Sequence, residues 1–189
     1  MMSRLPAKLR TTAGDSVENI VLGGGCFWCV EGALNGLRGV SEVIPGYSGG
    51  HVENPTYEQV CRKRTGHAEV VRVFFDADTI DTATLLEVFF TCHDPTQLNR
   101  QGNDIGPQYR SAAFYSNEEQ KSSIEDAITK SSTLYDAPIV TEVGPLINFF
   151  VAEDYHHDYF ENNPGNPYCR MVVAPKIAKT RAKHAPLYD

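Results

Sequence analysis

The chain has 189 residues, of which 41% are hydrophobic and 22% are charged, and its formal net charge is −7. This length and apolar content are typical of one globular domain with a sizeable core, and they exclude a wholly disordered or fibrous chain. The acidic charge argues against nucleic acid or an anionic membrane as a partner, and no apolar run approaches the roughly 20 residues that span a bilayer.

The hydrophobic pattern mixes strands and helices without a regular βαβ rhythm. Residues 1–18 are polar, and we expect them to fray. The first residues lack the apolar stretch of a signal peptide, which favours a cytoplasmic protein. We also expect a monomer. Strands are expected at residues 20–22, 39–44, 67–75, 111–115 and 139–143. Helices are expected at residues 26–37, 82–92, 118–132 with Asn117 as N-cap, and 152–161. A glycine-rich turn at 46–50, a polar loop at 96–109 and an extended piece at 171–174 complete an α+β fold.

Cys26 follows three glycines at the junction of an expected strand and an expected helix. Glycines allow a tight bend there, and the free N–H groups and dipole of a helix N-terminus stabilise a thiolate. We therefore predict a lowered pKa for the Cys26 thiol, and Phe27 and Trp28 are candidates for an apolar pocket beside the sulfur. The alternative is an ordinary buried cysteine in a glycine turn.

Cys26 and Cys29 form a C-x-x-C pair, which is compatible with a redox disulfide or with half of a zinc site. Zinc is disfavoured because no second closely spaced pair completes four ligands. The neighbouring His156 and His157 would point about 100° apart on a helix. A redox role for Cys29 and simple packing under the helix both remain open.

Glu69 lies on the face of the 67–75 strand that also carries Val71, Val73 and Phe75. Burial on that face would raise the pKa of the carboxyl and make it a proton donor at neutral pH. The alternative is a glutamate that reaches solvent at the strand end.

The other cysteines differ in their surroundings. Cys169 lies in a segment rich in proline, glycine and asparagine, where a mobile thiol could approach another sulfur. Cys61, in a short helix, and Cys92, at the end of an apolar helix, are expected to be bystanders. Two polar-aromatic clusters, at residues 55–57 and 102–110, suit a binding site on loops.

These segments together resemble the peptide methionine sulfoxide reductases of the A type, the family that reduces the S epimer of methionine sulfoxide. The resemblance extends in order from about residue 20 to residue 175. It is carried by residues 25–28, 46–50, 54–57, 65–69, 93–96, 103–111 and 152–156.

The resemblance implies a two-layer α/β sandwich with a ferredoxin-like core, in a single catalytic domain over residues 19–189 that includes a turn-rich tail. It makes Cys26 the nucleophile and Glu69 the acid that protonates the sulfoxide oxygen. Phe27 and Trp28 would hold the methyl group. The sulfoxide oxygen would be hydrogen-bonded, directly or through water, by Tyr57, Asp104 and Tyr109.

The implied reaction leaves Cys26 as a sulfenic acid, which a second thiol converts to a disulfide that thioredoxin reduces. Oxidised proteins and peptides would be the substrates, in protein repair, with no metal or other cofactor. The commonest family pattern has glycine in place of Cys29, and this chain has one late cysteine rather than two. We favour Cys169 as the resolving thiol, because Cys29 lies three residues further along the same helix and could bond to Cys26 only by distorting that helix. Cys29 is the second candidate, and direct reduction by an external thiol is the third.

Three other functions remain to be weighed against this one. A dithiol oxidoreductase acting through Cys26 and Cys29 would leave Glu69 without a role. A thiol acyl hydrolase would need a histidine base, for which His67 is available but nothing marks it. A binding module without activity is the third alternative.

Overall fold

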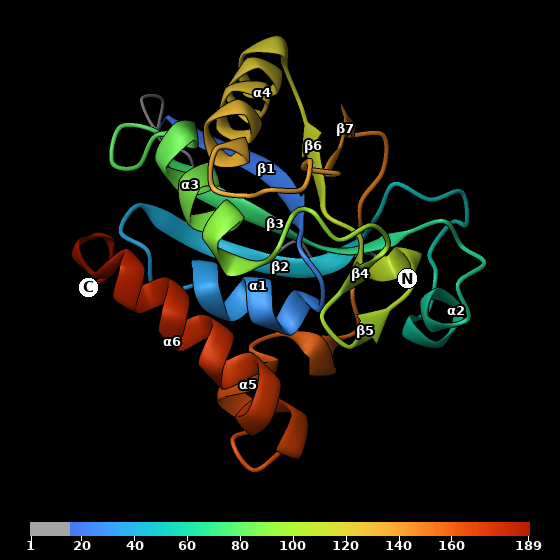
Figure 1. The fold of residues 1–189 in the computed structure, drawn as a ribbon. Helices are drawn as coiled ribbons and strands as arrows, with labels where there is room; N and C mark the ends of the chain where they lie inside the picture. Colours follow the sequence, from blue (N-terminus) through green and yellow to red (C-terminus); the bar gives the residue numbers. More distant parts are fainter. Residues whose placement is uncertain (1–15) are drawn as a thin grey trace.

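The computed structural model describes residues 16–189 and contains a six-stranded sheet with helices packed on it (Figure 1). The strands lie in the order β7-β6-β1-β3-β2-β8. Their bounds are β1 Val17–Gly23, β2 Val40–Ser48, β3 Ala68–Asp76, β6 Ala112–Tyr115, β7 Glu142–Pro145 and β8 Phe150–Val151. The neighbouring strands from β6 to β8 are antiparallel, whereas β7 runs parallel to β6.

The helices are of very different lengths. The α-helices are α1 Phe27–Leu34, α2 Tyr57–Cys61, α3 Thr82–Cys92, α4 Glu118–Ser132, α5 Tyr159–Asn162 and α6 Ala174–Lys183. Shorter helical turns are η1 Pro107–Tyr109, η2 Asp154–His156, the π-helix η3 Cys169–Val173, and η4 Ala185–Leu187. A separate two-stranded ribbon pairs β4 Arg100–Gln101 with β5 Asp104–Ile105.

The central elements have a ferredoxin-like connection. Along the chain they run β1, α1, β2, β3, α3, β6, and in the sheet the strands lie in the order β6-β1-β3-β2. The predicted α+β fold with a ferredoxin-like core is therefore confirmed.

Strand β3 shows how the sequence divides the sheet into two faces. Val71, Val73 and Phe75 are buried in the large core with residues of α1 and α3. Val70, from the opposite face of the strand, belongs to a smaller apolar cluster that Leu146 and Phe149 flank. The predicted alternation along this strand is confirmed, and it directs Glu69 towards the helix-covered face.

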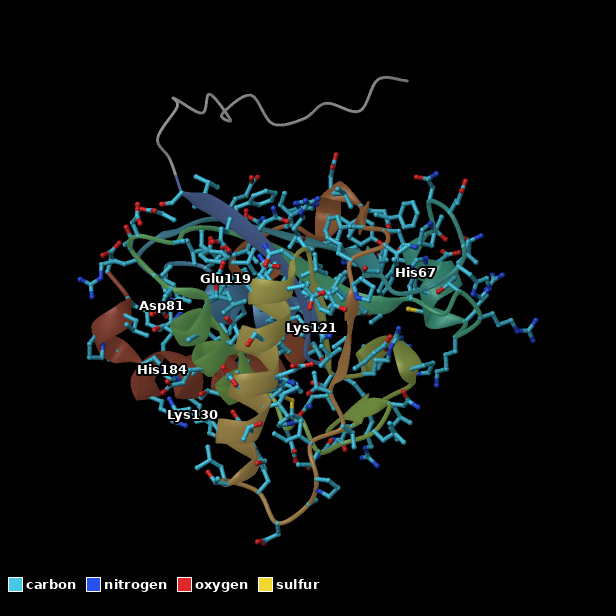
Figure 2. All side chains as sticks on the ribbon, turned by 90° about the horizontal axis from the view of Figure 1, so that it is seen from above. His67, Asp81, Glu119, Lys121, Lys130 and His184 are labelled. Carbon is cyan, nitrogen blue, oxygen red and sulfur yellow. The ribbon has the colours of Figure 1, made fainter. Side chains whose placement is uncertain are left out.

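Helices cover the sheet in contact with one another. Helix α6 packs along α1, and α3 packs against α4, as Figure 1 shows. Glu119, Lys121 and Lys130 lie along α4 in the view of Figure 2, whereas His67 lies far from that helix. Between residues 16 and 189, no helix combines the length and the apolar character that crossing a membrane requires.

The predicted boundaries differ from the structure in the first half of the chain. Residues 1–15 of the segment expected to fray lie outside the described part, and β1 already begins at Val17. Helix α1 ends at Leu34 rather than residue 37, because Asn35 is extended and Gly36 has φ +84°. The expected turn at 46–50 starts later, since β2 continues to Ser48.

The larger errors lie in the second half. The 96–109 loop contains β4, β5 and η1, and the 139–143 strand is shifted to Glu142–Pro145. The 152–161 helix is wrong: it is divided into η2 and α5, because Asp158 is left-handed at φ 51°. The 171–174 extended piece is also wrong, because it lies in η3 and the start of α6. Pro175 comes just after this π-helical turn, in a helical run that continues from η3 into α6.

Candidate active site

The turn between β1 and α1 places Cys26 at the N-cap of the helix. Gly25 has φ +90°, and a Cβ there would lie 2.7 Å from the Gln101 Cβ. A Cβ at Gly24 would lie 2.9 Å from the ring of His93. Both positions therefore exclude larger residues, and they pack the turn so tightly that the Cys26 side chain is only 6% exposed.

Glu69 approaches the same helix terminus from β3. Its side chain is 1% exposed, and its Oε2 accepts the backbone N–H of Phe27 at 3.1 Å. Burial, followed by the nearby Cys26 thiol, raises the pKa of Glu69 well above its usual value, although the Phe27 N–H opposes this. The prediction of a buried carboxyl group with a raised pKa is confirmed, and its neutral form can donate a proton at neutral pH.

The Cys26 thiol does not have the lowered pKa predicted from the helix N-terminus. Burial raises its pKa well above the usual value, and the neighbouring Cys29 thiol raises it further. The backbone N–H of Trp28 and the hydroxyl of Tyr168 lower it, but by less than burial raises it. The prediction was wrong because it considered the helix terminus without the loss of solvent around the sulfur.

Cys26 and Glu69 line one cavity of about 150 Å³. All five predicted substrate-binding residues line it too, and one further tyrosine completes the wall. The lining residues are Cys26, Phe27, Trp28, Tyr57, Glu69, Asp104, Tyr109 and Tyr168. Residues scattered over more than half of the chain thus meet around one sulfur atom.

The hydroxyl groups of the cavity come from different elements. Tyr57 begins α2, whose N-terminus is held by a capping box of Thr56 and Gln59, and Tyr109 ends η1. Burial, followed by the nearby Glu69, raises the pKa of both tyrosines. Both hydroxyls therefore keep their protons at neutral pH and can donate hydrogen bonds into the cavity.

Tyr168 is a cavity residue that the sequence pattern did not single out. Its hydroxyl donates to Asp104 Oδ2 at 2.5 Å. Burial, followed by the nearby Cys26 thiol, raises the pKa of Tyr168. Its position next to Cys169 was the one available signal, because a residue beside a candidate resolving thiol has to approach the same sulfur.

The indole of Trp28 is held on a face and on an edge. The Tyr159 ring stacks on it with centroids 3.7 Å apart and planes 5° apart. The Trp28 Nε1–H donates to His156 Nδ1 at 3.0 Å. Burial lowers the pKa of His156 to about 4, so the ring is neutral and Nδ1 can accept at neutral pH.

Glu153 connects the wall of the cavity to the sheet. Its carboxylate accepts hydrogen bonds from the hydroxyl of Tyr47, the backbone N–H of Tyr57 and the hydroxyl of Tyr155, each at 3.2 Å. Glu153 and His156 both belong to the 152–156 segment that carries the family resemblance, but no role was predicted for either.

Cys29 and Cys169 lie in one apolar cluster with Cys26, and all three carry free thiols. Cys169 is fully buried at the start of η3, and its backbone N–H donates to Asn166 Oδ1 at 3.2 Å. The sequence predicts a mobile thiol in a turn-rich segment, whereas the structure buries Cys169 in a helical turn that follows the turn at residues 164–165. Val172 and Val173 follow Cys169 in η3, which continues directly into α6, the helix that packs on α1.

The two remaining thiols have separate surroundings. Cys92 is buried in α3, where its Sγ donates to the Val88 carbonyl at 3.2 Å, and burial raises its pKa to about 12. Cys61 is half-buried at the end of α2, and burial raises its pKa although the Tyr57 hydroxyl opposes this. Within residues 16–189, no group of three His, Cys, Asp or Glu side chains is placed to hold a metal ion.

Comparisons with known proteins agree with this geometry. A family model described as peptide methionine sulfoxide reductase matches residues 18–187. The peptide methionine sulfoxide reductase MsrA of Saccharolobus solfataricus is 53% identical over 163 residues, which cover 86% of this chain and 92% of that protein. The reduced form of Mxr1 from Saccharomyces cerevisiae superposes with a TM-score of 0.77 at 30% identity, covering 82% of this chain and 90% of that one. Mxr1 has also been solved in complex with Trx2, with a TM-score of 0.57 at 19% identity, covering 81% and 91% of the two chains.

Proposed function

The chain belongs to the peptide methionine sulfoxide reductase family and is a methionine sulfoxide reductase; from this premise we propose which of its residues perform each step. Cys26 is the nucleophile and Glu69 is the proton donor. The observation that carries this assignment is that both groups line one small cavity whose other walls are aromatic rings and hydroxyl groups.

Substrate binding divides the cavity into two halves. Phe27 and Trp28 form the apolar half and hold the methyl group of the sulfoxide, since apolar surface is favourably removed from water there. The polar half is formed by Tyr57, Asp104 and Tyr109, which bind the sulfoxide oxygen directly or through water.

The chemical step is a proton transfer coupled to attack by sulfur. Glu69 gives its proton to the sulfoxide oxygen, and Cys26 Sγ forms a bond to the activated sulfur while the thiol proton passes to the Glu69 carboxylate. The hydroxyl group then passes from the substrate sulfur to Cys26 Sγ as the sulfur–sulfur bond breaks, so that methionine leaves and Cys26 is left as a sulfenic acid. Burial keeps both groups neutral before the reaction, so no isolated charge has to be desolvated when the substrate enters.

The same arrangement favours one epimer of the sulfoxide. The sulfur of the substrate carries a methyl group, an oxygen, a longer side chain and a lone pair. If the methyl group and the oxygen occupy their two halves and the sulfur faces Cys26, one configuration directs the side chain to the cavity opening and its mirror image directs it into the wall. In agreement with the A-type resemblance, the accepted epimer is S.

The sulfenic acid is resolved by a second thiol of the same chain. Condensation of Cys26–SOH with a thiol forms a disulfide and releases water. Cys169 is favoured because it lies on a separate helical segment that can move towards Cys26, whereas Cys29 is fixed on the helix that begins next to Cys26. Both thiols belong to the same apolar cluster as Cys26, which supports both candidates. Direct reduction of the sulfenic acid by an external thiol is the third candidate.

Thioredoxin is the reductant that returns the disulfide to two thiols, at the expense of its own dithiol. The complex of the fold neighbour Mxr1 with Trx2 supports this choice. The physiological role that follows is the repair of oxidised methionine in proteins.

A single assay tests the proposal. With dithiothreitol, the purified protein should convert N-acetyl-methionine-S-sulfoxide to N-acetyl-methionine and leave the R epimer unchanged. Cys26→Ser should abolish turnover, whereas Cys92→Ser, in which the buried α3 thiol is replaced, should retain it. Retained turnover in Cys26→Ser would exclude this nucleophile, and equal reduction of both epimers would exclude the proposed division of the cavity.

A further inference from the structure

Glu31 is a buried carboxyl group that the proposed mechanism does not use. It lies in α1, three residues after Trp28, and its side chain is 2% exposed. Residues three apart are neighbours on a helix surface, so Glu31 lies one turn behind the indole that lines the cavity.

The carboxylate of Glu31 holds the segment that begins α5. Its Oε1 accepts the backbone N–H of Asp158 at 2.9 Å. Asp158 is left-handed, at φ 51° and ψ 35°, and it is the N-cap of α5. Its side chain makes no capping hydrogen bond; its Oδ1 instead accepts from Asn35 Nδ2 at 3.3 Å. A non-glycine residue in that conformation needs support from its surroundings, and Glu31 supplies it from another helix.

The held segment returns directly to Trp28. Tyr159 follows Asp158, and its ring stacks on the indole at a centroid distance of 3.7 Å. These contacts form a closed loop. Trp28 and Glu31 are about one turn apart on α1, and Glu31 accepts the Asp158 N–H. The residue after Asp158 is Tyr159, whose ring stacks on Trp28. Loss of the Glu31 hydrogen bond would release the ring that covers one face of the indole.

A buried carboxyl group is a poor choice for a residue that only fills space in a core. Burial raises its pKa to about 7, and the facing acids of α5, Asp158 and Glu161, add to this, while the Asp158 and Tyr159 N–H groups oppose it. The nearby cation on α6 is Arg181, whose guanidinium donates to the carbonyls of Gly32 and Asn35 instead. An apolar side chain would pack at this site without the loss of solvation that a carboxyl group suffers.

We propose that Glu31 is a positioning residue for the methyl-binding wall: by accepting the Asp158 N–H, it holds Tyr159 against the indole and fixes the orientation of Trp28. The inference rests on the proposed function, in which Trp28 binds the methyl group of the sulfoxide. Glu31 itself does not touch the cavity.

The test compares Glu31→Ala with Glu31→Gln, which keeps an acceptor oxygen. Glu31→Ala should raise KM for N-acetyl-methionine-S-sulfoxide about 5- to 20-fold while kcat changes less than threefold, because the wall is displaced and the reacting groups are not. Trp28 is the one tryptophan of the chain, so its fluorescence reports on the wall alone. In Glu31→Ala, we expect a red-shifted emission maximum and faster quenching by acrylamide, and Glu31→Gln should restore both KM and fluorescence to within about twofold.

Two further variants separate positioning from folding and from charge. Tyr159→Leu leaves Glu31 and its hydrogen bond in place, and it should reproduce the KM and fluorescence changes even if Glu31→Ala does not fold. In the double variant, Glu31→Ala should add no further change to Tyr159→Leu. Glu161→Gln removes an exposed charge from the same short helix and should behave like the wild type.

Several outcomes would overturn the inference. These are a wild-type KM and fluorescence in Glu31→Ala or in Tyr159→Leu, additive effects in the double variant, or a loss confined to kcat. A wild-type protein that reduces no sulfoxide would contradict the proposed function instead, and the fluorescence measurements would still decide whether Glu31 positions Trp28.

Discussion

Cys26 and Glu69 reach the same cavity from a helix N-cap and from the middle of a sheet, and desolvation acts on both in the same direction. Burial favours the neutral thiol and the neutral carboxylic acid. A sulfoxide needs a proton on its oxygen before its sulfur becomes a good electrophile, so the neutral acid is the more important of the two initial states. The thiol can then lose its proton during the attack rather than before it.

The first prediction concerns Glu69→Gln. The amide keeps an acceptor for the Phe27 N–H, so the fold and KM should change little, but it has no proton to give to the sulfoxide. We expect kcat with dithiothreitol to fall about 10²- to 10³-fold, within the usual range for loss of a general acid. Steady-state kinetics with the S epimer measure this, with the thermal midpoint as the check on folding, and an unchanged kcat would mean that another group protonates the oxygen.

The second prediction concerns Tyr168, which the sequence pattern did not single out. Tyr168→Phe removes the hydroxyl that donates to Asp104 and that lowers the pKa of Cys26. Loss of about 1 kcal/mol of hydrogen bonding should lower kcat/KM roughly three- to tenfold. Tyr155→Phe is the matched control. The Tyr155 hydroxyl also donates to a carboxylate, that of Glu153, but the Tyr155 side chain is exposed and does not line the cavity. Equal effects of the two changes would contradict a specific role for Tyr168.

At the scale of elements, local signals predicted some helices well and failed where distant contacts decide. The predicted 82–92 helix and the Asn117 N-cap are confirmed, because apolar spacing and capping act within one element. The 152–161 helix failed at Asp158, which is left-handed and whose backbone N–H donates to Glu31, a residue far away in the sequence. A pattern that is read along the chain cannot include such a partner.

The third prediction concerns the missed helix α6, whose Ile177 is 4% exposed in the cluster that contains Cys26, Cys29 and Cys169. Ile177→Ala should lower the free energy of unfolding by about 2–4 kcal/mol, because buried methyl groups are lost and a cavity remains. Met171→Ala, at a position 77% exposed in the adjoining η3, should change it by less than about 0.5 kcal/mol. Urea denaturation measures both, and a similarly small effect at Ile177 would mean that α6 adds little to the core.

The fourth prediction assigns the resolving thiol. With thioredoxin as the sole reductant, Cys169→Ser should lose multiple turnover and Cys29→Ser should keep most of it, whereas both should remain active with dithiothreitol. Cys169 is buried in η3, in the same apolar cluster as Cys26. The reverse pattern would make Cys29 the resolving thiol, and full activity of both variants with thioredoxin would favour direct reduction of the sulfenic acid.

At the scale of the whole molecule, the sequence predicted the class of fold and most residues of the cavity, but by different routes. Hydrophobic alternation along β3 placed Glu69 on the covered face, which burial confirms. The ferredoxin-like strand order and the meeting of Tyr57, Asp104 and Tyr109 were predicted by the family resemblance, because pairing between distant strands leaves no local pattern. Tyr168 was missed because the segment was interpreted through its neighbour Cys169 alone.

The last prediction links one buried group to the stability of the whole protein. The pKa of Glu31 rises from 4.5 in the unfolded chain to about 7 in the folded one, so the folded state binds the extra proton between these values. Stability should therefore fall as pH rises from 4.5 to 7, and the loss should stay constant above pH 7. The loss amounts to up to about 3 kcal/mol, because a tenfold change in an acidity constant corresponds to about 1.36 kcal/mol.

Glu31→Gln removes this contribution while Glu69 remains in both proteins, so the difference between the two unfolding free energies isolates Glu31. Urea denaturation at pH 5 and pH 8 should show the variant gaining on the wild type at the higher pH. Parallel curves would show that Glu31 does not titrate in this range, whereas the expected divergence would mean that the carboxyl group costs stability at neutral pH, as an active-site support retained for its effect on Trp28 would do.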